Sequence, residues 1–500
     1  MGNYSVPEEI RRLKPKGTSV KPIKGNYYVY THSQVKDPET GKWKTATGKL
    51  IGRIIPGIGF CSNDEGVKSE VVTCFDYGEY LLACSHAKDD YNLLKEFFNP
   101  DEAMMLISLA IIFSVKGYVG LKDAEDIYER SLIARDFPAL RFSYRRISTL
   151  LELIGRTEMA KDFQKRCFGN ADEVAIDGHA IPGKSKENDL VSAGFKTKSI
   201  KSEYMNLMVA LDVETGEPVS TRVFPGYSLD KSVFVDFVST LGSVRNKLIL
   251  VDMGFFSREN MDYIEENGGS YIVPVSENRK EYKEFSKSTR GRNASFIYHR
   301  NGKNDVVEYR EYESDGGRFI YFKNTTEAER LSYIYLDNLE KGEKGYSMEE
   351  YERQRKKYGV ILLETNLKEK GAGEIYCHYK NRWSIETYYD RLKNGIDFES
   401  LNIDDWALAQ GVAFVMLLAG RIDSRILKDA KRLKMTRKEL VSFMKFLKLT
   451  DNGKTVTIHN RKKRHTEVAE LLGLSFDTTL KCLGWLLCIT IALIVINNAS

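Results

Sequence analysis

The hydrophobic and polar positions between residues 171 and 275 form short apolar runs that alternate with amphipathic segments. Short apolar runs bounded by turn residues predict buried strands, and a repeat of three to four residues predicts helices. The expected strands are 173–177, 206–213, 218–226, 246–252 and 270–275, and the expected helices are 232–242 and 257–269. The order of three strands, helix, strand, helix and strand indicates an α/β domain.

The pattern before this domain predicts two other kinds of structure. Residues 1–25 are polar and basic, which predicts a flexible arm. Aromatic and β-branched runs on either side of a turn sequence predict a β-hairpin, with a further strand after it, at 27–35, 44–54 and 70–75. Asn99-Pro100 begins a series of helical patterns, so we expect a helical segment over 100–170.

The pattern after residue 275 favours strands again and then helices. Strands are expected over 294–300, 305–312, 317–323 and 358–366, with helices over 326–340 and 349–359. A strongly apolar helical pattern and basic segments follow, which predict a helical C-terminal region over 401–500. The charge-free run 482–496 would measure about 22 Å as a helix, shorter than the roughly 30 Å core of a bilayer. We therefore expect a buried helix there, with a membrane contact as the alternative.

Composition and charge narrow the class of protein. A chain of 500 residues exceeds one compact core, so more than one domain is expected. Charged residues make up 29% and hydrophobic residues 42%, which is typical of globular proteins. The net charge is only +5, but residues 1–50 and 421–470 carry large excesses of Lys and Arg. Both ends therefore suit a polyanion, and two solvated basic surfaces are the alternative interpretation.

The seven cysteines form no C-x2-C pair and their number is odd. A disulfide framework and a zinc finger are therefore not indicated, and a reducing compartment fits better. The N-terminal residues lack the apolar core of a signal peptide. We expect no membrane partner.

The most informative chemistry lies in residues 376–400. Tyr379, Arg382, Glu386 and Lys393 are spaced so that one helix of about four turns would carry all of them on one face. An Arg–Glu pair at this spacing is common on solvated helices. The full pattern of Tyr-x2-Arg-x3-Glu-x6-Lys is more specific.

This stretch resembles the YREK signature of the DDE transposases of bacterial insertion sequences, in the superfamily named after insertion sequence four. In that family the Glu is the third catalytic metal ligand, and the Tyr, Arg and Lys hold phosphates of the DNA end. The resemblance therefore implies a metal ligand at Glu386 and phosphate contacts at Tyr379, Arg382 and Lys393.

Two upstream aspartates complete the resemblance. Asp177 and Asp252 each end an expected strand, a position that by itself is also typical of turns. The sequence DMGF from Asp252 matches the Asp-x-Gly-Phe/Tyr of the family. The family often has Asp-Gly-Thr at the first Asp, whereas this chain has DGH, and His179 either faces the site or is a hydrogen-bonded structural residue.

The resemblance implies phosphoryl transfer with two Mg²⁺ or Mn²⁺ ions, which prefer oxygen ligands. Asp177 would bridge the two ions, Asp252 would complete one site, and Glu386 the other. Water would free a 3′-OH at the element end, and that 3′-OH would attack target DNA. The implied partners are double-stranded DNA, as terminal inverted repeats and target, and a second copy in a synaptic homodimer. The implied location is the bacterial cytoplasm, at the nucleoid.

The implied fold is a ribonuclease-H-like α/β core interrupted by a β-rich insertion domain, with a mixed β/α N-terminal DNA-binding region and a helical C-terminal region. The expected parts are 1–99, 100–170, 171–275 (first part of the core), 276–375 (insertion), 376–400 (catalytic helix) and 401–500. Several relatives hold a flipped base with an aromatic residue of the insertion, where this chain offers Tyr and Phe but no Trp. Further DNA contacts are expected at Arg11, Arg12, Lys42, Lys44, Arg461, Lys462, Lys463 and Arg464.

Two other functions are compatible with parts of the sequence. A transposase descendant that binds DNA without cutting it would keep the basic ends, and intact Asp177, Asp252 and Glu386 speak against it. A glycosidase using Asp252 and Glu386 as an acid/base pair would leave the cations of the signature unexplained.

Overall fold

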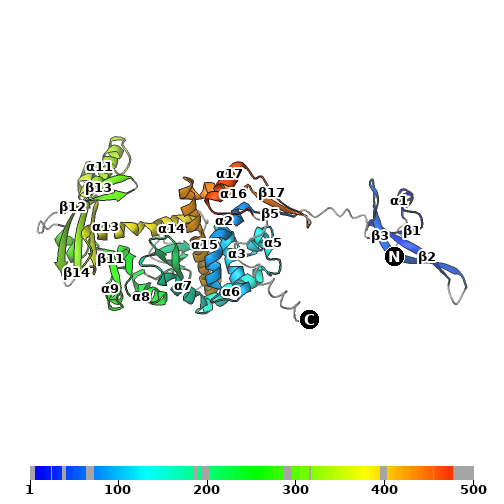
Figure 1. The fold of residues 1–500 in the computed structure, drawn as a ribbon, viewed down its shortest axis with the longest axis horizontal. Coiled ribbons are helices and arrows are strands. Elements are labelled where there is room, and N and C mark those ends of the chain that lie inside the picture. The colour runs from blue at the N-terminus through cyan, green and yellow to red at the C-terminus, as the bar shows by residue number, and fades with distance from the viewer. Residues whose placement is uncertain are drawn as a thin grey trace. The chain divides into compact units, whose positions relative to one another are not determined.

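The computed structural model describes residues 6–23, 25–36, 41–62, 73–183, 190–193, 203–228, 230–286, 294–300, 302–314, 317–394, 403–453 and 455–476 (Figure 1). The chain divides into two compact units. The first comprises residues 1–74 and 449–457, and the second comprises residues 75–448 and 458–500. The expected run 482–496 lies outside the described residues.

The first unit contains an antiparallel sheet in the order β1-β2-β3-β4. Its elements are α1 (Glu8–Arg12), β1 (Thr18–Ile23), β2 (Asn26–Lys36), β3 (Trp43–Ile55) and β4 (Gly59–Ser62). The expected hairpin is confirmed as β2 and β3. The expectation of a flexible arm is wrong for α1 and β1, because β1 pairs with β2 along its length and Ile10 packs with Val29 and Ile54.

The second unit begins with helices. They are α2 (Gly78–Leu94), α3 (Pro100–Lys116), α4 (Leu121–Glu129), α5 (Leu132–Asp136), α6 (Tyr144–Arg156) and α7 (Met159–Gly169). Asn99 caps α3 by accepting the backbone N–H of Glu102 at 3.0 Å, as its sequence indicated. The pattern analysis assigned no helix to α2, because residues 78–84 are all buried and the exposed residues Lys88, Asp89 and Asn92 fall only in its second half.

One large sheet forms the centre of the second unit. Its order is β12-β13-β14-β15-β11-β10-β6-β8-β7, and β9 pairs with β8. The first strands are β6 (Glu173–Pro182), β7 (Ser192–Ala193), β8 (Glu203–Asp212), β9 (Pro218–Pro225), β10 (Leu248–Val251) and β11 (Ser270–Pro274). Between them lie α8 (Asp230–Leu241), η1 (Met253–Phe255) and α9 (Arg258–Glu266). The expected order of strands and helices is confirmed, apart from the short β7.

The expected end of the first strand is wrong. β6 continues beyond Asp177 to Pro182, because its antiparallel pairing with β8 extends to Pro182 opposite Tyr204. Its parallel pairing with β10 stops earlier, at Ile176 opposite Val251. Asp177 therefore lies within a strand, but at the level where the neighbouring strand has ended.

The strands of the expected insertion continue the same sheet. They are β12 (Ala294–Arg300), β13 (Lys303–Ser314), β14 (Gly317–Asn324) and β15 (Val360–Thr365), and β15 pairs antiparallel with β11. The helical elements here are α10 (Lys280–Phe285), α11 (Thr325–Glu340), α12 (Met348–Gln354) and η2 (Arg355–Lys357). Phe285, Phe319 and Leu362 form a local core. The segment is therefore rich in strands as expected, but its strands form no sheet of their own.

The single helix expected from Tyr379 to Lys393 is also wrong. The structure has two, α13 (Ala372–Asn381) and α14 (Trp383–Asn394), which run end to end in Figure 1. At the junction, the Arg382 N–H donates to the Tyr379 carbonyl, and the Ile385 N–H donates to the Arg382 carbonyl. These bonds span three residues instead of four, so the backbone tightens at Arg382.

The remaining elements are α15 (Trp406–Arg432), α16 (Arg437–Lys445), β16 (Lys448–Asp451), β17 (Val456–His459) and α17 (Lys463–Leu471). β16 and β17 join β5 (Thr73–Asp76) in the sheet order β17-β16-β5. The expectation of a helical C-terminal region is therefore wrong for residues 448–459, which form a β-hairpin. The turn sequence explains this hairpin, since Asn452 accepts the Thr455 N–H at 2.7 Å and Gly453 adopts a φ of 79°.

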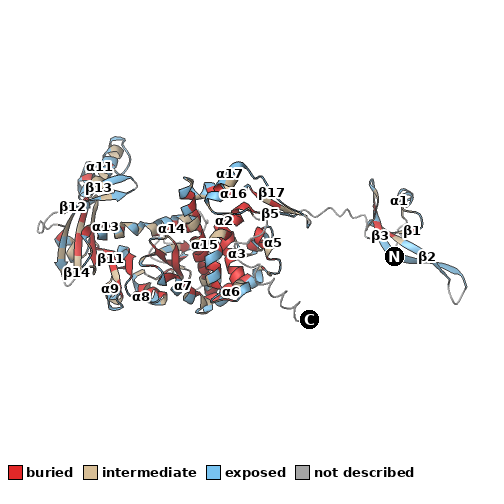
Figure 2. Cartoon of the chain, viewed as in Figure 1, coloured by how far each residue is buried: buried red, intermediate tan, exposed pale blue. Residues whose placement is uncertain are grey.

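α15 is the core helix of the second unit and packs against α3, α6 and β9. Figure 2 shows buried residues along much of it. Its length and hydropathy would suit a membrane span, but 83% of its apolar window is buried inside the protein. Its Asp423, 2% exposed, pairs with Arg391 of α14 at 3.1 Å and with Arg437 of α16 at 2.6 Å.

Candidate active site

Asp177 lies on β6, and Asp252 directly follows β10, the parallel strand next to it. The last paired residues of β6 and β10 are Ile176 and Val251, so the two aspartates follow directly after the same rung of the ladder. Asp177 is half-buried, and its carboxylate accepts the N–H of Gly178 at 2.8 Å. Asp252 is exposed. The pairing therefore brings two residues 75 positions apart in sequence to one edge of β10.

Glu386 lies in the first turn of α14 and is exposed. Its carboxylate accepts a hydrogen bond from a guanidinium nitrogen of Arg382 at 2.6 Å. The Arg382 side chain is only 11% exposed, although it lies at the junction of two helices. The signature therefore contains a nearly buried cation next to its carboxylate.

Arg382 interacts electrostatically with all three acidic residues. Burial alone lowers the pKa of its guanidinium, but Tyr379 and the carboxylates of Asp252, Glu386 and Asp177 together raise that pKa above its ordinary value. Glu386 bonds to Arg382 directly, and Asp252 and Asp177 act on it through their charge. The charges of the three carboxylates expected to form the site therefore all stabilise the Arg382 cation.

Tyr379 lies on α13 and is buried beside this cation, with Arg382 5.6 Å from its ring centroid. Burial, with contributions from Asp252 and Glu386, raises the pKa of its phenol to about 12. Tyr379 is therefore a neutral hydrogen-bonding group at the site. Lys393, the last member of the signature, is exposed near the end of α14.

The acidic residues fit a divalent metal by their chemistry, since carboxylate oxygens are the ligands that Mg²⁺ and Mn²⁺ prefer. Within the described part of the chain, however, no three His, Cys, Asp or Glu side chains lie close enough to hold one ion. Glu386 points its carboxylate to Arg382 instead. Binding a metal between the three would therefore require at least one of these side chains to move.

A cavity of about 560 Å³ adjoins the site, and the sequence gave no indication of it. It is lined by Tyr298, Arg300, Lys303, Asp305, Asn324, Glu327, Arg330, Tyr379, Lys380, Arg382, Trp383 and Glu386. The guanidinium of Arg300 lies 4.3 Å from the centre of the Trp383 ring. Burial lowers the pKa of Lys380. Cations from β12, β13 and α11 thus face the signature residues across one hollow.

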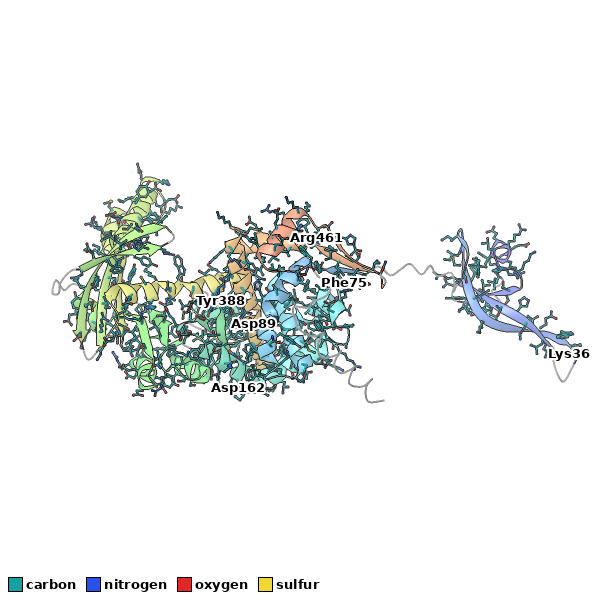
Figure 3. All side chains as sticks on the ribbon, in the orientation of Figure 1. Lys36, Phe75, Asp89, Asp162, Tyr388 and Arg461 are labelled. Carbon is teal, nitrogen blue, oxygen red and sulfur yellow. The ribbon has the colours of Figure 1, made fainter. Side chains whose placement is uncertain are left out.

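The other cations expected to contact DNA are exposed. Arg11 and Arg12 lie on α1, and Lys42 and Lys44 lie at the start of β3. Arg461 to Arg464 lead into α17, and Figure 3 labels Arg461. These side chains are exposed to solvent, although Arg12 pairs with Glu8 and Lys463 with Glu467, and none lines the cavity beside Arg382.

Two residues near Asp177 were not assigned a role by the sequence. His179 is exposed, and its ring stacks on that of Tyr389 from α14, with centroids 4.9 Å apart. The Tyr389 hydroxyl donates to the backbone carbonyl of Asp177 at 2.8 Å. A periodic apolar pattern alone marks Tyr389 only as a core residue.

Comparison with known proteins identifies a family to which this chain is similar. A family model described as "Transposase DDE domain" matches residues 169–419, half of the chain. No curated protein matches. A solved structure, described as a cryo-EM structure of a piggyBac transposase synaptic complex with hairpin DNA, matches 74% of this chain and 78% of its own. Its identity is 13% and its TM-score is 0.39, too low to support an argument.

Proposed function

The chain belongs to the family of transposases with a DDE domain, and on that premise we propose that it cuts DNA at the ends of its mobile element and joins the resulting 3′-OH ends to target DNA. The observation that carries the proposal is that Asp177 and Asp252 both directly follow the last paired rung of the parallel strands β6 and β10, with Glu386 on α14 bonded to Arg382. Within the family, we place the chain in the YREK branch of bacterial insertion sequences.

We assign the metal-binding role to Asp177, Asp252 and Glu386. Two bound Mg²⁺ or Mn²⁺ ions would supply stabilisation of the negative charge that develops on the attacked phosphate. In the metal-free protein, Arg382 balances part of the charge of the carboxylates. The same guanidinium, already held beside the site, has the planar fork that suits a phosphate oxygen pair.

The chain's own residues would orient the DNA end. Tyr379 stays neutral because its pKa is raised, so its hydroxyl can donate to a phosphate oxygen. Lys393 would add a mobile point charge. The cavity beside them offers Arg300, Lys303 and other cations to nucleotides of the terminal repeat, and Tyr298 supplies an aromatic ring from the strand-rich segment.

Sequence-independent affinity would come from the exposed cations at both ends of the chain, which displace counterions from DNA. We assign recognition of the element ends to residues 1–170. Because two element ends must meet for joining, we propose a homodimer in the synaptic complex. We place this activity in the bacterial cytoplasm, where the nucleoid offers target DNA.

The test is cleavage of a labelled duplex that carries the terminal repeat flanking the gene, with Mg²⁺ or Mn²⁺. The wild type is compared with Asp177→Asn, Asp252→Asn and Glu386→Gln. Glu266→Gln, an exposed carboxylate on α9, is the matched control. We expect nicking at the repeat boundary by the wild type and the control, and at least a hundredfold slower nicking by the three site variants with DNA binding kept.

A second readout is independent of cleavage. Mg²⁺ should raise the melting temperature of the wild type, because a ligand that binds only the folded state stabilises it. That rise should shrink in Asp177→Asn and persist in Glu266→Gln. Full cleavage by Glu386→Gln would refute the assigned chemistry. Specific binding of the repeat without cleavage by the wild type would favour the DNA-binding descendant.

A further inference from the structure

Two adjacent tyrosines on α14 are both buried but have different surroundings. Tyr388 packs beside Gly420 of α15, and its hydroxyl has no hydrogen-bond partner in the described part of the chain. Tyr389 faces the central sheet instead. Figure 3 labels Tyr388 on α14. The pair therefore offers two hydroxyl groups in one helical turn, of which only one is bonded to the sheet.

The Tyr389 hydroxyl reaches β6, which carries Asp177, and the neighbouring strand β8. It donates to the backbone carbonyl of Asp177 at 2.8 Å and lies 3.3 Å from the carbonyl of Leu207. Leu207 of β8 is paired with His179 of β6. The His179 ring stacks on the Tyr389 ring, with an interplanar angle of 24°. The side chain is thus held at its hydroxyl and along one ring face.

The hydrogen bond of Tyr389 connects the backbone of Asp177 to the helix that carries Glu386. The carbonyl that accepts the hydrogen bond belongs to Asp177 itself, so it is fixed to the same α-carbon as the carboxylate. Glu386 precedes Tyr389 by three residues, less than one helical turn. Any shift of α14 relative to β6 would therefore change the separation of the two carboxylates.

The other end of α14 is held elsewhere. Arg391 donates to the Ser424 hydroxyl at 2.9 Å and pairs with Asp423, both on α15. These bonds fix the C-terminal end of α14 to the helical core, and the Tyr389 hydroxyl bonds α14 to the sheet.

We propose that Tyr389 is a positioning residue that sets the separation between Asp177 and Glu386, with His179 as the ring on which it rests. This inference rests on the proposed function of these two carboxylates. A displacement of about 1 Å at a catalytic group can cost on the order of a hundredfold in rate. Loss of one hydroxyl should therefore affect the chemical step far more than the binding of DNA.

The experiment compares Tyr389→Phe with Tyr388→Phe, two removals of a hydroxyl from adjacent buried rings. The full chain and the duplex with the terminal repeat are used, and kcat, KM and the Mg²⁺ concentration for half-maximal rate are measured. For Tyr389→Phe we expect kcat to fall by about tenfold to a hundredfold, with KM within about twofold and a higher Mg²⁺ requirement. Tyr388→Phe should behave as the wild type.

His179 gives a second test that does not disturb the core, because its side chain is exposed. His179→Ala removes the ring and should lower kcat, whereas His179→Phe keeps a ring for stacking and should restore it. A purely structural role would not predict this recovery together with a changed Mg²⁺ requirement.

The outcomes separate the inference from the function on which it rests. If the wild type cleaves and Tyr389→Phe keeps its kcat and Mg²⁺ requirement, the inference is overturned and the function stands. If Tyr389→Phe loses thermal stability and DNA binding along with its rate, the role is structural and the inference again fails. If the wild type does not cleave in either metal, the proposed function fails and the inference fails with it.

Discussion

Gly411 of α15 lies against the backbone of α6, where a methyl group should be costly. A Cβ atom at Gly411 would lie 2.2 Å from the carbonyl oxygen of Leu151. The contact is reciprocal, since a Cβ at Gly155 of α6 would lie 2.0 Å from the carbonyl oxygen of Ala407. Ordinary contacts of a Cβ begin at 3.4 Å. In Gly411→Ala the two backbones must therefore separate by about 1 Å, because neither oxygen can rotate away.

The loss in free energy of unfolding depends on how many packing contacts between α6 and α15 this separation weakens. The buried face of α6 comprises Ile147, Leu150, Leu151 and Ile154. A gap of up to about 1 Å removes roughly a quarter to a half of the dispersion energy of a contact. Overpacking of this kind costs about 1–3 kcal/mol or more, and the better helix propensity of Ala returns at most about 1 kcal/mol. We expect the free energy of unfolding to fall by about 2 kcal/mol.

The assay is urea denaturation of the second unit in the full chain, followed by helical circular dichroism. The control is Gly169→Ala at the end of α7, where a Cβ would meet nothing within 4 Å. That change should be neutral or slightly stabilising. The double variant Gly155→Ala/Gly411→Ala should lose less than the two single losses added, because one separation relieves both contacts. A Gly411→Ala protein as stable as Gly169→Ala would refute this account of the interface.

Two further predictions concern charge. Burial alone raises the pKa of Asp76, but Lys116 and Lys448 lower that pKa on balance below its ordinary value of 3.8. The ionised Asp76 therefore stabilises the folded protein above pH 3.8, and this stabilisation is lost as the pH falls through the folded-state pKa. Asp76→Asn should therefore lower the free energy of unfolding at neutral pH. Urea titrations at several pH values should show that the difference in this free energy from the wild type shrinks in acid. A difference that does not depend on pH would contradict a lowered pKa at Asp76. Neutral replacement of Arg461, Lys462, Lys463 and Arg464 should weaken DNA binding uniformly across sequences and flatten the slope of log affinity against log salt by as much as about 3 to 4. Fluorescence anisotropy at several salt concentrations measures that slope. The control is a variant in which the ion-paired Lys161 and Lys165 are replaced by neutral residues. An unchanged slope in the first variant would exclude residues 461–464 from the DNA interface.

The chain's local patterns predicted most individual elements. The strands of the sheet from β8 to β15 and the hairpin of β2 and β3 follow from alternation and from turn residues, which act over a few positions. The pattern of Tyr379, Arg382, Glu386 and Lys393 and the DMGF sequence at Asp252 pointed to a DDE transposase, and the family model that matches residues 169–419 agrees at that level.

Local patterns failed where a neighbour distant in sequence decides the outcome. β6 extends past Asp177 because β8 continues to pair with it, and no signal within residues 173–182 records that partner. α2 was missed because its first seven residues are all buried, so its exposed polar positions appear only after Cys84. The helix expected over the signature breaks at Arg382, whose guanidinium is nearly buried beside charges from three different elements.

The sequence by itself determined which residues are the candidates for the chemistry: two aspartates next to apolar strands, a glutamate among cations, and basic segments near both ends. Only the tertiary structure decided how they meet. The parallel pairing of β6 with β10 brings Asp177 level with Asp252, and the Tyr389 hydroxyl fixes α14 to Asp177. Both depend on hydrogen bonds between segments 75 to more than 200 residues apart, and such pairing leaves no periodic trace in either segment.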